Sequence, residues 1–212
     1  MCGKIRARKS WAATVDAAAA RADGAGGETV PLRVMADLPV IVFDGGERMV
    51  LPMRWGFPDP KDWRRPRPIH ARAETIDITP AFAAAFRDGQ RGIVLAESFN
   101  EAPDSGEQHI VMPAGPIGLA FVWRRFDIAG KALFACVMVT VPANRLLMGL
   151  PTDRMPAVLG HEDWAVWLGE EAGDAKACLR TMEDARWTMT GEERAASVRR
   201  ARPVVSDPGG LF

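Results

Sequence analysis

Six apolar runs, rich in Val, Ile, Leu and Phe and separated by Gly, Pro and Asp, constrain the fold of this chain most strongly. They are LPVIVF (38–43), RMVLPMRWGF (48–57), RGIVLAESF (91–99), QHIVMPA (108–114), IGLAFVWRRF (117–126) and KALFACVMVTV (131–141). Runs of this kind, bounded by turn residues, are typical of β-strands. Because they follow one another largely without helical crossovers, an antiparallel, curled or barrel-like sheet is favoured over a doubly wound one.

Helical patterns flank these runs and dominate after residue 160. TPAFAAAFRDG predicts a short helix with Thr79 as its N-cap and Gly89 at its end. HEDWAVWLGEE predicts a helix whose tryptophans face the core. Further helices are predicted at 10–27, 173–182 and 191–201, and an extended, turn-rich end at 202–212. The sequence therefore predicts one α+β domain over residues 1–212, with a strand-rich antiparallel, barrel-like core and flanking helices.

Composition excludes several classes of function. The 212-residue chain has 27 basic and 27 acidic residues, so no global field attracts it to DNA or to an anionic membrane. No run is long enough to predict a transmembrane helix, and the basic start leads to no signal-peptide core. The three cysteines and three histidines are widely spaced, which predicts no disulfide framework, metal site or cofactor. We therefore expect a cytoplasmic protein.

The start of the chain, MCGKIRARKS, places Cys2 directly after the initiator methionine. Removal of Met1 would leave Cys2 with a thiol and a free α-amine on the same carbon. The first ten residues hold four basic side chains and no acidic one, which predicts an increased thiolate fraction at Cys2. The alternative is that position two is incidental and Cys2 is an ordinary thiol.

A proline-rich stretch between residues 53 and 77 is predicted to form an ordered surface loop. Trp55 and Trp63 are interleaved there with cations, namely Lys61, Arg64, Arg65, Arg67 and Arg72. Aromatic planes and guanidinium groups on a rigid loop suit single-stranded nucleic acid, whose bases stack and whose phosphates pair with Arg. The sequence leaves open the alternative that Trp55 belongs to the core and that the arginines are merely solvated.

Two further segments carry candidate polar groups. VLAESFNEA places Glu97 and Glu101 on one face of a strand with Phe99 between them, which is either an acid/base site or a solvated face. PTDRMPAVLG is a proline-bounded turn with Arg154 as its single cation.

An ordered set of motifs resembles the SOS-response-associated peptidase (SRAP) family. The motifs are MCG at the start, MRWGF near 53, ARAET at 71–75, ESFNEA at 97–102, GLAFVW at 118–123 and DRMPAVL at 153–159, followed by HEDWAVWL. Each motif is weak alone, but their order and spacing are specific, and they cover residues 1 to about 170.

The resemblance implies a function, and with it a nucleoid-associated protein that works as a monomer. SRAP proteins lose their initiator methionine and use Cys2 to capture abasic sites in single-stranded DNA, through a Schiff base that closes to a thiazolidine. By position, Glu101 matches the family's catalytic glutamate. Further matches lie in the ARAE loop and the RMP motif. With the cationic loop they give the expected DNA-binding residues Arg72, Glu74, Arg154, Trp55, Arg65, Arg67 and Thr152.

The chain departs from the family pattern at several polar positions. His70 stands where the family usually has asparagine, and Thr152 stands where it usually has histidine. Asn100 and Ala102 replace an aromatic pair around the catalytic glutamate, and the family's asparagine-rich C-terminal stretch is not recognisable. We therefore hypothesise that His70 supplies the lost acid/base function, as a third catalytic residue beside Cys2 and Glu101.

Two other functions are compatible with parts of the sequence. The departures favour a degenerate family member that binds DNA, or another partner, without covalent capture. An N-terminal-cysteine glutamine amidotransferase also begins MCG, but the downstream signatures of that class are missing here. Because only Met1 precedes Cys2, an aminopeptidase would suffice to expose it, and we do not expect proteolysis of other proteins.

Overall fold

The computed structural model describes residues 2–8, 29–101, 108–150 and 152–192. All six runs predicted to be strands are strands, and the prediction of a strand-rich, barrel-like α+β fold is confirmed. They are β3 (Asp37–Asp44), β4 (Glu47–Trp55), β6 (Arg91–Glu101), β7 (Gln108–Met112), β8 (Ile117–Ile128) and β9 (Lys131–Pro142).

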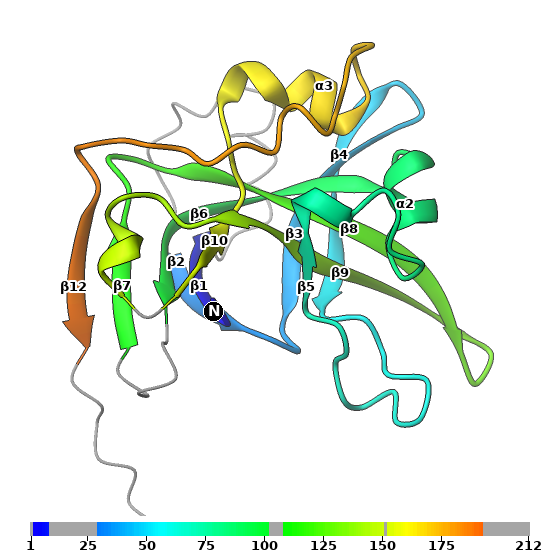
Figure 1. Ribbon diagram of the computed structural model, residues 1–212. Coiled ribbons are helices and arrows are strands. Elements are labelled where there is room, and N and C mark those ends of the chain that lie inside the picture. The colour runs from blue at the N-terminus through cyan, green and yellow to red at the C-terminus, as the bar shows by residue number, and fades with distance from the viewer. Residues whose placement is uncertain (1, 9–28, 102–107, 151, 193–212) are drawn as a thin grey trace, which may run out of the picture.

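Five of these strands close into a barrel (Figure 1). The order runs β8-β9-β4-β3-β6, and β6 pairs with β8 to complete the circle. All pairings in this ring are antiparallel except that of β4 with β9, where Arg54 lies opposite Ala135 in a parallel ladder. The barrel is therefore mixed, because the chain crosses from β4 to β9 through other elements and does not return by a tight hairpin.

Short strands extend the sheet beyond the barrel. They are β1 (Lys4–Arg8), β2 (Thr29–Arg33), β5 (His70–Arg72), β10 (Arg154–Pro156), β11 (Val158–Leu159) and β12 (Thr188–Glu192). β1 is antiparallel to both β2 and β6, and β12 is antiparallel to β7. β5 and β10 both pair with the second half of β9. The sequence prediction lacked these strands, and three of them, β5, β10 and β11, are too short to show alternation.

The helices of the described residues are shorter than predicted. They are η1 (Ala73–Thr75), α2 (Ala83–Arg87), η2 (Leu147–Gly149), η3 (His161–Asp163) and α3 (Trp164–Leu168). Phe82 and not Thr79 is the N-cap of α2, although Gly89 ends this segment with a φ of 75°. The helix predicted at 173–182 is wrong, since this stretch forms turns, and β12 occupies the start of the one predicted at 191–201. The rest of that predicted helix lies outside the described residues. So do the helix predicted at 10–27 and the extended end predicted at 202–212. No described helix has the length and hydropathy needed to cross a membrane.

Large apolar side chains fill the barrel and the space under α3. Trp55 and Phe121 are fully buried and meet edge to face, with ring centroids 6.1 Å apart. Trp164, Trp167 and Leu168 of α3 are buried, which confirms the predicted core-facing stripe. The indole of Trp167 donates to the backbone oxygen of Gly92 at 3.0 Å, so α3 is fixed to β6.

Gly92 tests this packing because it leaves no room for a side chain. A Cβ there would overlap Val40 Cγ1 and lie 3.1 Å from the Ile41 backbone oxygen. We expect Gly92→Ala to lower the free energy of unfolding by about 1–3 kcal/mol through overpacking. The matched control is Gly115→Ala, where a Cβ would meet nothing within 4 Å. Urea denaturation of both variants measures the difference, and equal stabilities would contradict this description of the core.

Candidate functional site

The pairing of β1 with β6 brings the start of the chain to the end of a barrel strand. Lys4 lies opposite Asn100 and Ile5 opposite Phe99, so the residues just before β1 continue alongside Glu101. Cys2 is buried at 2% exposure, and its thiol donates to the Lys4 backbone oxygen at 3.4 Å. Cys2 and Glu101, two of the three predicted catalytic residues, are therefore adjacent.

Burial controls the protonation of this pair. Glu101 is only 1% exposed, and burial raises the pKa of its carboxyl group, while the backbone N–H of Cys2 that faces it acts in the opposite direction. Burial also raises the pKa of the Cys2 thiol, and the negative charge of Glu101 raises it further. The prediction that basic neighbours increase the thiolate fraction is therefore wrong, because burial outweighs them and Arg6 is exposed to solvent.

His70 completes a trio at the N-terminus. β5 runs parallel to β9, with His70 opposite Met138, and this pairing carries the imidazole to the start of β1. The His70 Nε2 lies 2.6 Å from the Cys2 carbonyl oxygen and must donate, since a carbonyl oxygen only accepts. Burial lowers the pKa of His70, although the Cys2 carbonyl partly counteracts this. His70 thus holds the Cys2 main chain as a neutral imidazole with Nε2 occupied.

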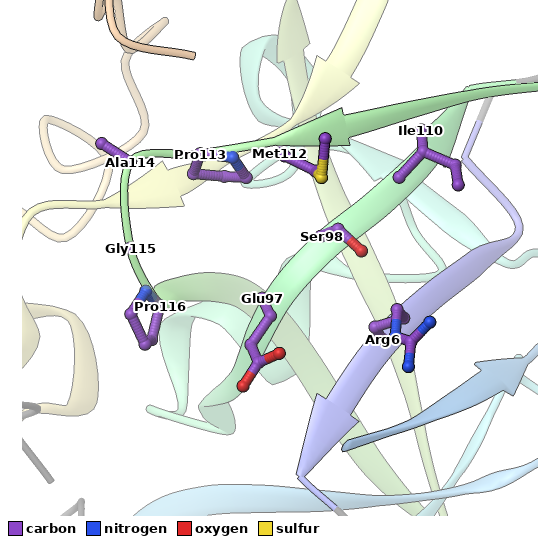
Figure 2. Close-up of a pocket in the computed structure, with 9 residues that line it drawn as sticks. All are labelled: Arg6, Glu97, Ser98, Ile110, Met112, Pro113, Ala114, Gly115 and Pro116. Atoms are coloured by element: carbon purple, nitrogen blue, oxygen red, sulfur yellow. The ribbon is translucent and has the colours of Figure 1, made fainter. Parts of the chain in front are cut away.

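Glu97 does not join this trio, contrary to the expectation that it shares a face with Glu101. Arg6 pairs with Ser98 but Ala7 pairs with Ala96, so Glu97 is the extra residue of a β-bulge. The bulge breaks the alternation of the strand and leaves Glu97 exposed. Its carboxylate lines a different cavity, which Figure 2 shows.

This cavity, of about 450 Å³, lies on the face of the β1–β6–β7 sheet opposite to the one that carries Glu101 (Figure 2). Arg6 and Ser98 face it as cross-strand partners, whereas their neighbours Ile5 and Phe99 point into the core. Its remaining lining comes from β7 and the following turn, namely Ile110, Met112, Pro113, Ala114, Gly115 and Pro116. Because the sheet separates it from Glu101, we do not count it as part of the site.

The predicted cationic loop between β4 and β5 is ordered by its own backbone hydrogen bonds. The backbone N–H of Phe57 donates to the Pro68 oxygen at 3.0 Å, and the backbone N–H of Arg67 donates to the Phe57 oxygen at 2.8 Å. Trp63 near its tip is 46% exposed, and the guanidinium carbons of Arg54 and Arg64 lie 6.0 and 5.4 Å from its ring centroid. The loop therefore presents an aromatic plane flanked by cations.

The other predicted residues of this segment fall into two groups. Arg65 and Arg67 are exposed, and the side chain of Arg65 makes a solvent-exposed ion pair with Asp62 at 3.5 Å. Trp55 is fully buried and donates to the Ile69 backbone oxygen at 3.3 Å. The prediction that Trp55 contacts DNA is therefore wrong, because the barrel core encloses its ring.

The ARAE and RMP motifs meet at the end of β9, because β5 and β10 flank it. Arg154 is 6% exposed and forms a bidentate ion pair with Glu74, at 2.5 and 2.9 Å. It also donates to the Thr140 backbone oxygen at 2.5 Å. The guanidinium of Arg154, which is predicted to contact DNA, is thus already paired with the Glu74 carboxylate. Its role in this structure is to hold that ion pair together.

Arg72 and Thr152 border this ion pair. Arg72 is exposed. The hydrogen bond from Arg154 lowers the pKa of Glu74 most, and the positive charge of Arg72 lowers it further. Thr152 is half-buried, and its hydroxyl donates to the Arg154 backbone oxygen at 3.1 Å. Thr152 therefore shapes the turn that carries Arg154, while Arg72 is the cation of this cluster that faces solvent.

A groove of about 720 Å³ connects the loop to the trio. It is lined by Val34, Pro66, Arg67, Pro68, Ile69 and His70. Its lining includes the exposed side chain of Arg67 and the imidazole of His70 that bonds Cys2, and the other four residues are apolar. The groove is therefore mostly apolar, with Arg67 as the one cation of its lining.

His109 was not predicted as a site residue, because no local motif surrounds it in the sequence. In the sheet it lies on β7 directly opposite Glu101. The antiparallel pairing of the consecutive strands β6 and β7 brings the two together. Among the described residues, no group of three or more His, Cys, Asp or Glu side chains is arranged to hold a metal ion.

The depressed pKa of His70 makes stability depend on pH. In the unfolded chain a histidine has a pKa of about 6.5, so below that pH the unfolded state binds a proton that folded His70 resists. The free energy of unfolding of the wild type should therefore fall, relative to that of His70→Gln, as the pH is lowered from about 7.5 to about 5.5. Urea denaturation across this range measures the difference. Parallel pH dependences would contradict the proposed state of His70.

Comparison with known proteins places the chain in a family. Its fold is similar to that of a Bordetella bronchiseptica protein, with 21% identity, a TM-score of 0.73, and coverage of 91% of this chain and 100% of that chain. A Bacteroides thetaiotaomicron protein is also similar, with 18% identity, a TM-score of 0.73 and coverage of 91% and 93%. So is a phage-related protein of B. bronchiseptica, with 19% identity, a TM-score of 0.64 and coverage of 91% and 95%.

A search of curated proteins returns no match. The model of the family described as SOS response associated peptidase (SRAP), however, matches residues 1–198. Together with the motif order and the shared fold, this match shows that the chain belongs to the SRAP family.

Proposed function

We propose that this protein captures abasic sites in single-stranded DNA as a monomer, through a covalent bond to Cys2 after Met1 is removed. Membership of the SRAP family supports a function associated with DNA damage. The observation that carries the finer proposal is the position of Cys2, whose backbone nitrogen and thiol both adjoin the buried carboxyl group of Glu101. Removal of Met1 turns that nitrogen into an α-amine.

Burial of the two groups sets the order of the chemical steps. Because the Cys2 thiol is held protonated, the amine attacks the aldehyde of the ring-opened abasic sugar first and forms a carbinolamine. Glu101, whose raised pKa lets it carry a proton, protonates the leaving hydroxyl group, so that water departs and an iminium remains. The thiol then adds to the iminium carbon and transfers its proton to the Glu101 carboxylate, closing the thiazolidine.

His70 acts in this proposal as a positioning residue. Its Nε2 holds the Cys2 carbonyl oxygen at 2.6 Å and so limits rotation of the residue that carries both nucleophiles. This role replaces the hypothesis that His70 supplies a general acid/base.

The loop between β4 and β5 supplies the DNA-binding surface. Trp63 offers its exposed face to a base, and Arg65, Arg67 and Arg72 are exposed to phosphates. Because none of these contacts reads a base edge, we expect little preference for sequence.

The covalent step is tested with an abasic single-stranded oligonucleotide and a denaturing gel. The wild type should form a band that survives denaturation, and an undamaged oligonucleotide should not. Cys2→Ala keeps the α-amine but lacks the thiol, so it should give only an imine that borohydride traps. Glu101→Gln should slow the reaction by about 10²–10⁴-fold, through loss of the general acid.

Cys178→Ala is the matched control, since Cys178 is buried beside the Asp163 and Asp174 backbone oxygens and away from Glu101. It should crosslink like the wild type. A stable band with Cys2→Ala, or none with the wild type, would refute covalent capture.

Non-covalent DNA binding is the second candidate function. The burial of the Cys2 thiol and the replacement of a family histidine by Thr152 favour it. In that case the wild type would bind the abasic strand under native conditions and release it on the denaturing gel.

Trp63 tests the DNA-binding surface separately from the chemistry. Loss of one stacking platform is worth about 1–3 kcal/mol, so Trp63→Ala should weaken binding of an undamaged single strand by roughly 5- to 150-fold. Met112→Ala, which removes a comparably exposed apolar side chain beside the cavity on the other face, should leave binding unchanged. Fluorescence anisotropy at fixed salt measures both, and equal affinities would refute this surface.

A further inference from the structure

Thiazolidine formation releases one proton inside the buried site. This inference rests on the proposed function. An α-amine has a pKa of about 7.7–8.0 and is mostly ammonium at neutral pH. The balanced reaction is therefore ammonium, thiol and aldehyde giving thiazolidine, one water and one proton. That proton comes from the ammonium and has to reach bulk solvent.

Glu101 cannot deliver this proton to solvent by itself. It is the acid/base that adjoins the Cys2 nitrogen, but it is only 1% exposed. A residue that is partly accessible to water and lies next to Glu101 is needed to complete the path.

The sheet places His109 in that position. Glu101 of β6 and His109 of β7 are direct cross-strand partners, so they share a face with Cβ atoms about 4.5–5.5 Å apart. Their neighbours on the same face, Phe99 and Val111, are fully buried, whereas His109 is only half-buried. The pair therefore lies where this face passes from the core to solvent.

The strand on the other side of His109 leaves space for water. Gly191 of β12 is its cross-strand partner, and a Cβ at Gly191 would meet no atom of the described residues within 4 Å. Imidazole is the side chain that takes up and releases protons most readily near neutral pH. Its two nitrogens let it accept a proton on one side and release it on the other.

We propose that His109 is the proton relay of this site, passing the proton released by the Cys2 ammonium from Glu101 to solvent. His109 acts through Glu101 and does not touch the DNA. It is therefore a positioning residue that serves Glu101, and not a catalytic residue. Of the described residues, Glu101 is the titratable group facing it from β6. Cys2 and His70 lie beyond Glu101, and β12 offers only Gly191 and Met189 on this face.

The test is the single-turnover rate of crosslinking to an abasic single strand, measured in weak buffer between about pH 6 and pH 8.5. His109→Gln should react at least about tenfold more slowly than the wild type, with unchanged affinity for the undamaged strand. Added free imidazole should restore the rate of the variant and leave that of the wild type unchanged. The pH profile of the variant should follow the imidazole that is added.

The matched control is His161→Gln. His161 is exposed and stacks on Trp164 with ring centroids 4.8 Å apart, in a part of the chain that does not adjoin Glu101. It should react like the wild type with and without imidazole. His109→Asn is a second variant that shows the same slow, rescuable reaction if the relay is correct, and circular dichroism verifies that each variant folds.

The outcomes separate this proposal from the one on which it rests. If the wild type crosslinks and the His109 variants crosslink equally fast, the relay is refuted while the proposed function stands. A slow variant that imidazole does not rescue also refutes the relay, because a structural defect would produce it. A wild type that never crosslinks overturns the proposed function and the relay together.

Discussion

The antiparallel pairing of β1 with β6 is the contact on which the whole site depends. It fixes Ile5 opposite Phe99, both fully buried, and thereby holds the two residues before β1 against the end of β6. A one-residue slip would turn Ile5 out of the core, so the register is strongly specified. The core of the barrel thus fixes the position of an N-terminal residue, which in most proteins would be poorly ordered.

Burial gives the site its character as much as the identity of its residues does. The same enclosure keeps the Cys2 thiol protonated, lets Glu101 carry a proton and keeps His70 neutral. These states suit an ordered addition in which the amine reacts first and the thiol closes the ring. In the proposed reaction protons also cross the boundary between the core and water, and for this reason the partly exposed neighbours of Glu101 matter.

The sequence predicted the fold well wherever the pattern was local. The six long strands and the core-facing stripe of Trp164 and Trp167 follow from composition and spacing alone. The prediction of a helix at 173–182 was wrong. The segment forms turns that bury apolar side chains, and these tertiary contacts override its helical propensity.

The candidate site was predictable only in part. The motif order indicated Cys2 and Glu101, but the roles of their neighbours depend on how the strands pair and on which side chains the barrel encloses. Trp55 is enclosed by the barrel, and Glu97 is turned outward by a bulge that no sequence pattern marks. His109 reaches Glu101 only through the pairing of β7 with β6.

The central claim is that the N-terminal nitrogen and sulfur of Cys2 bond together to one abasic carbon. The intact mass of the denatured complex tests it most directly. The account predicts one species whose mass is that of the protein without Met1 plus that of the abasic oligonucleotide, less one water, with fragmentation placing the bond at residue 2. This mass should stay unchanged on treatment with borohydride, which would add two hydrogens to an imine formed by the amine alone. Recovery of free oligonucleotide and protein, or of an adduct in which Met1 is still attached, would contradict it.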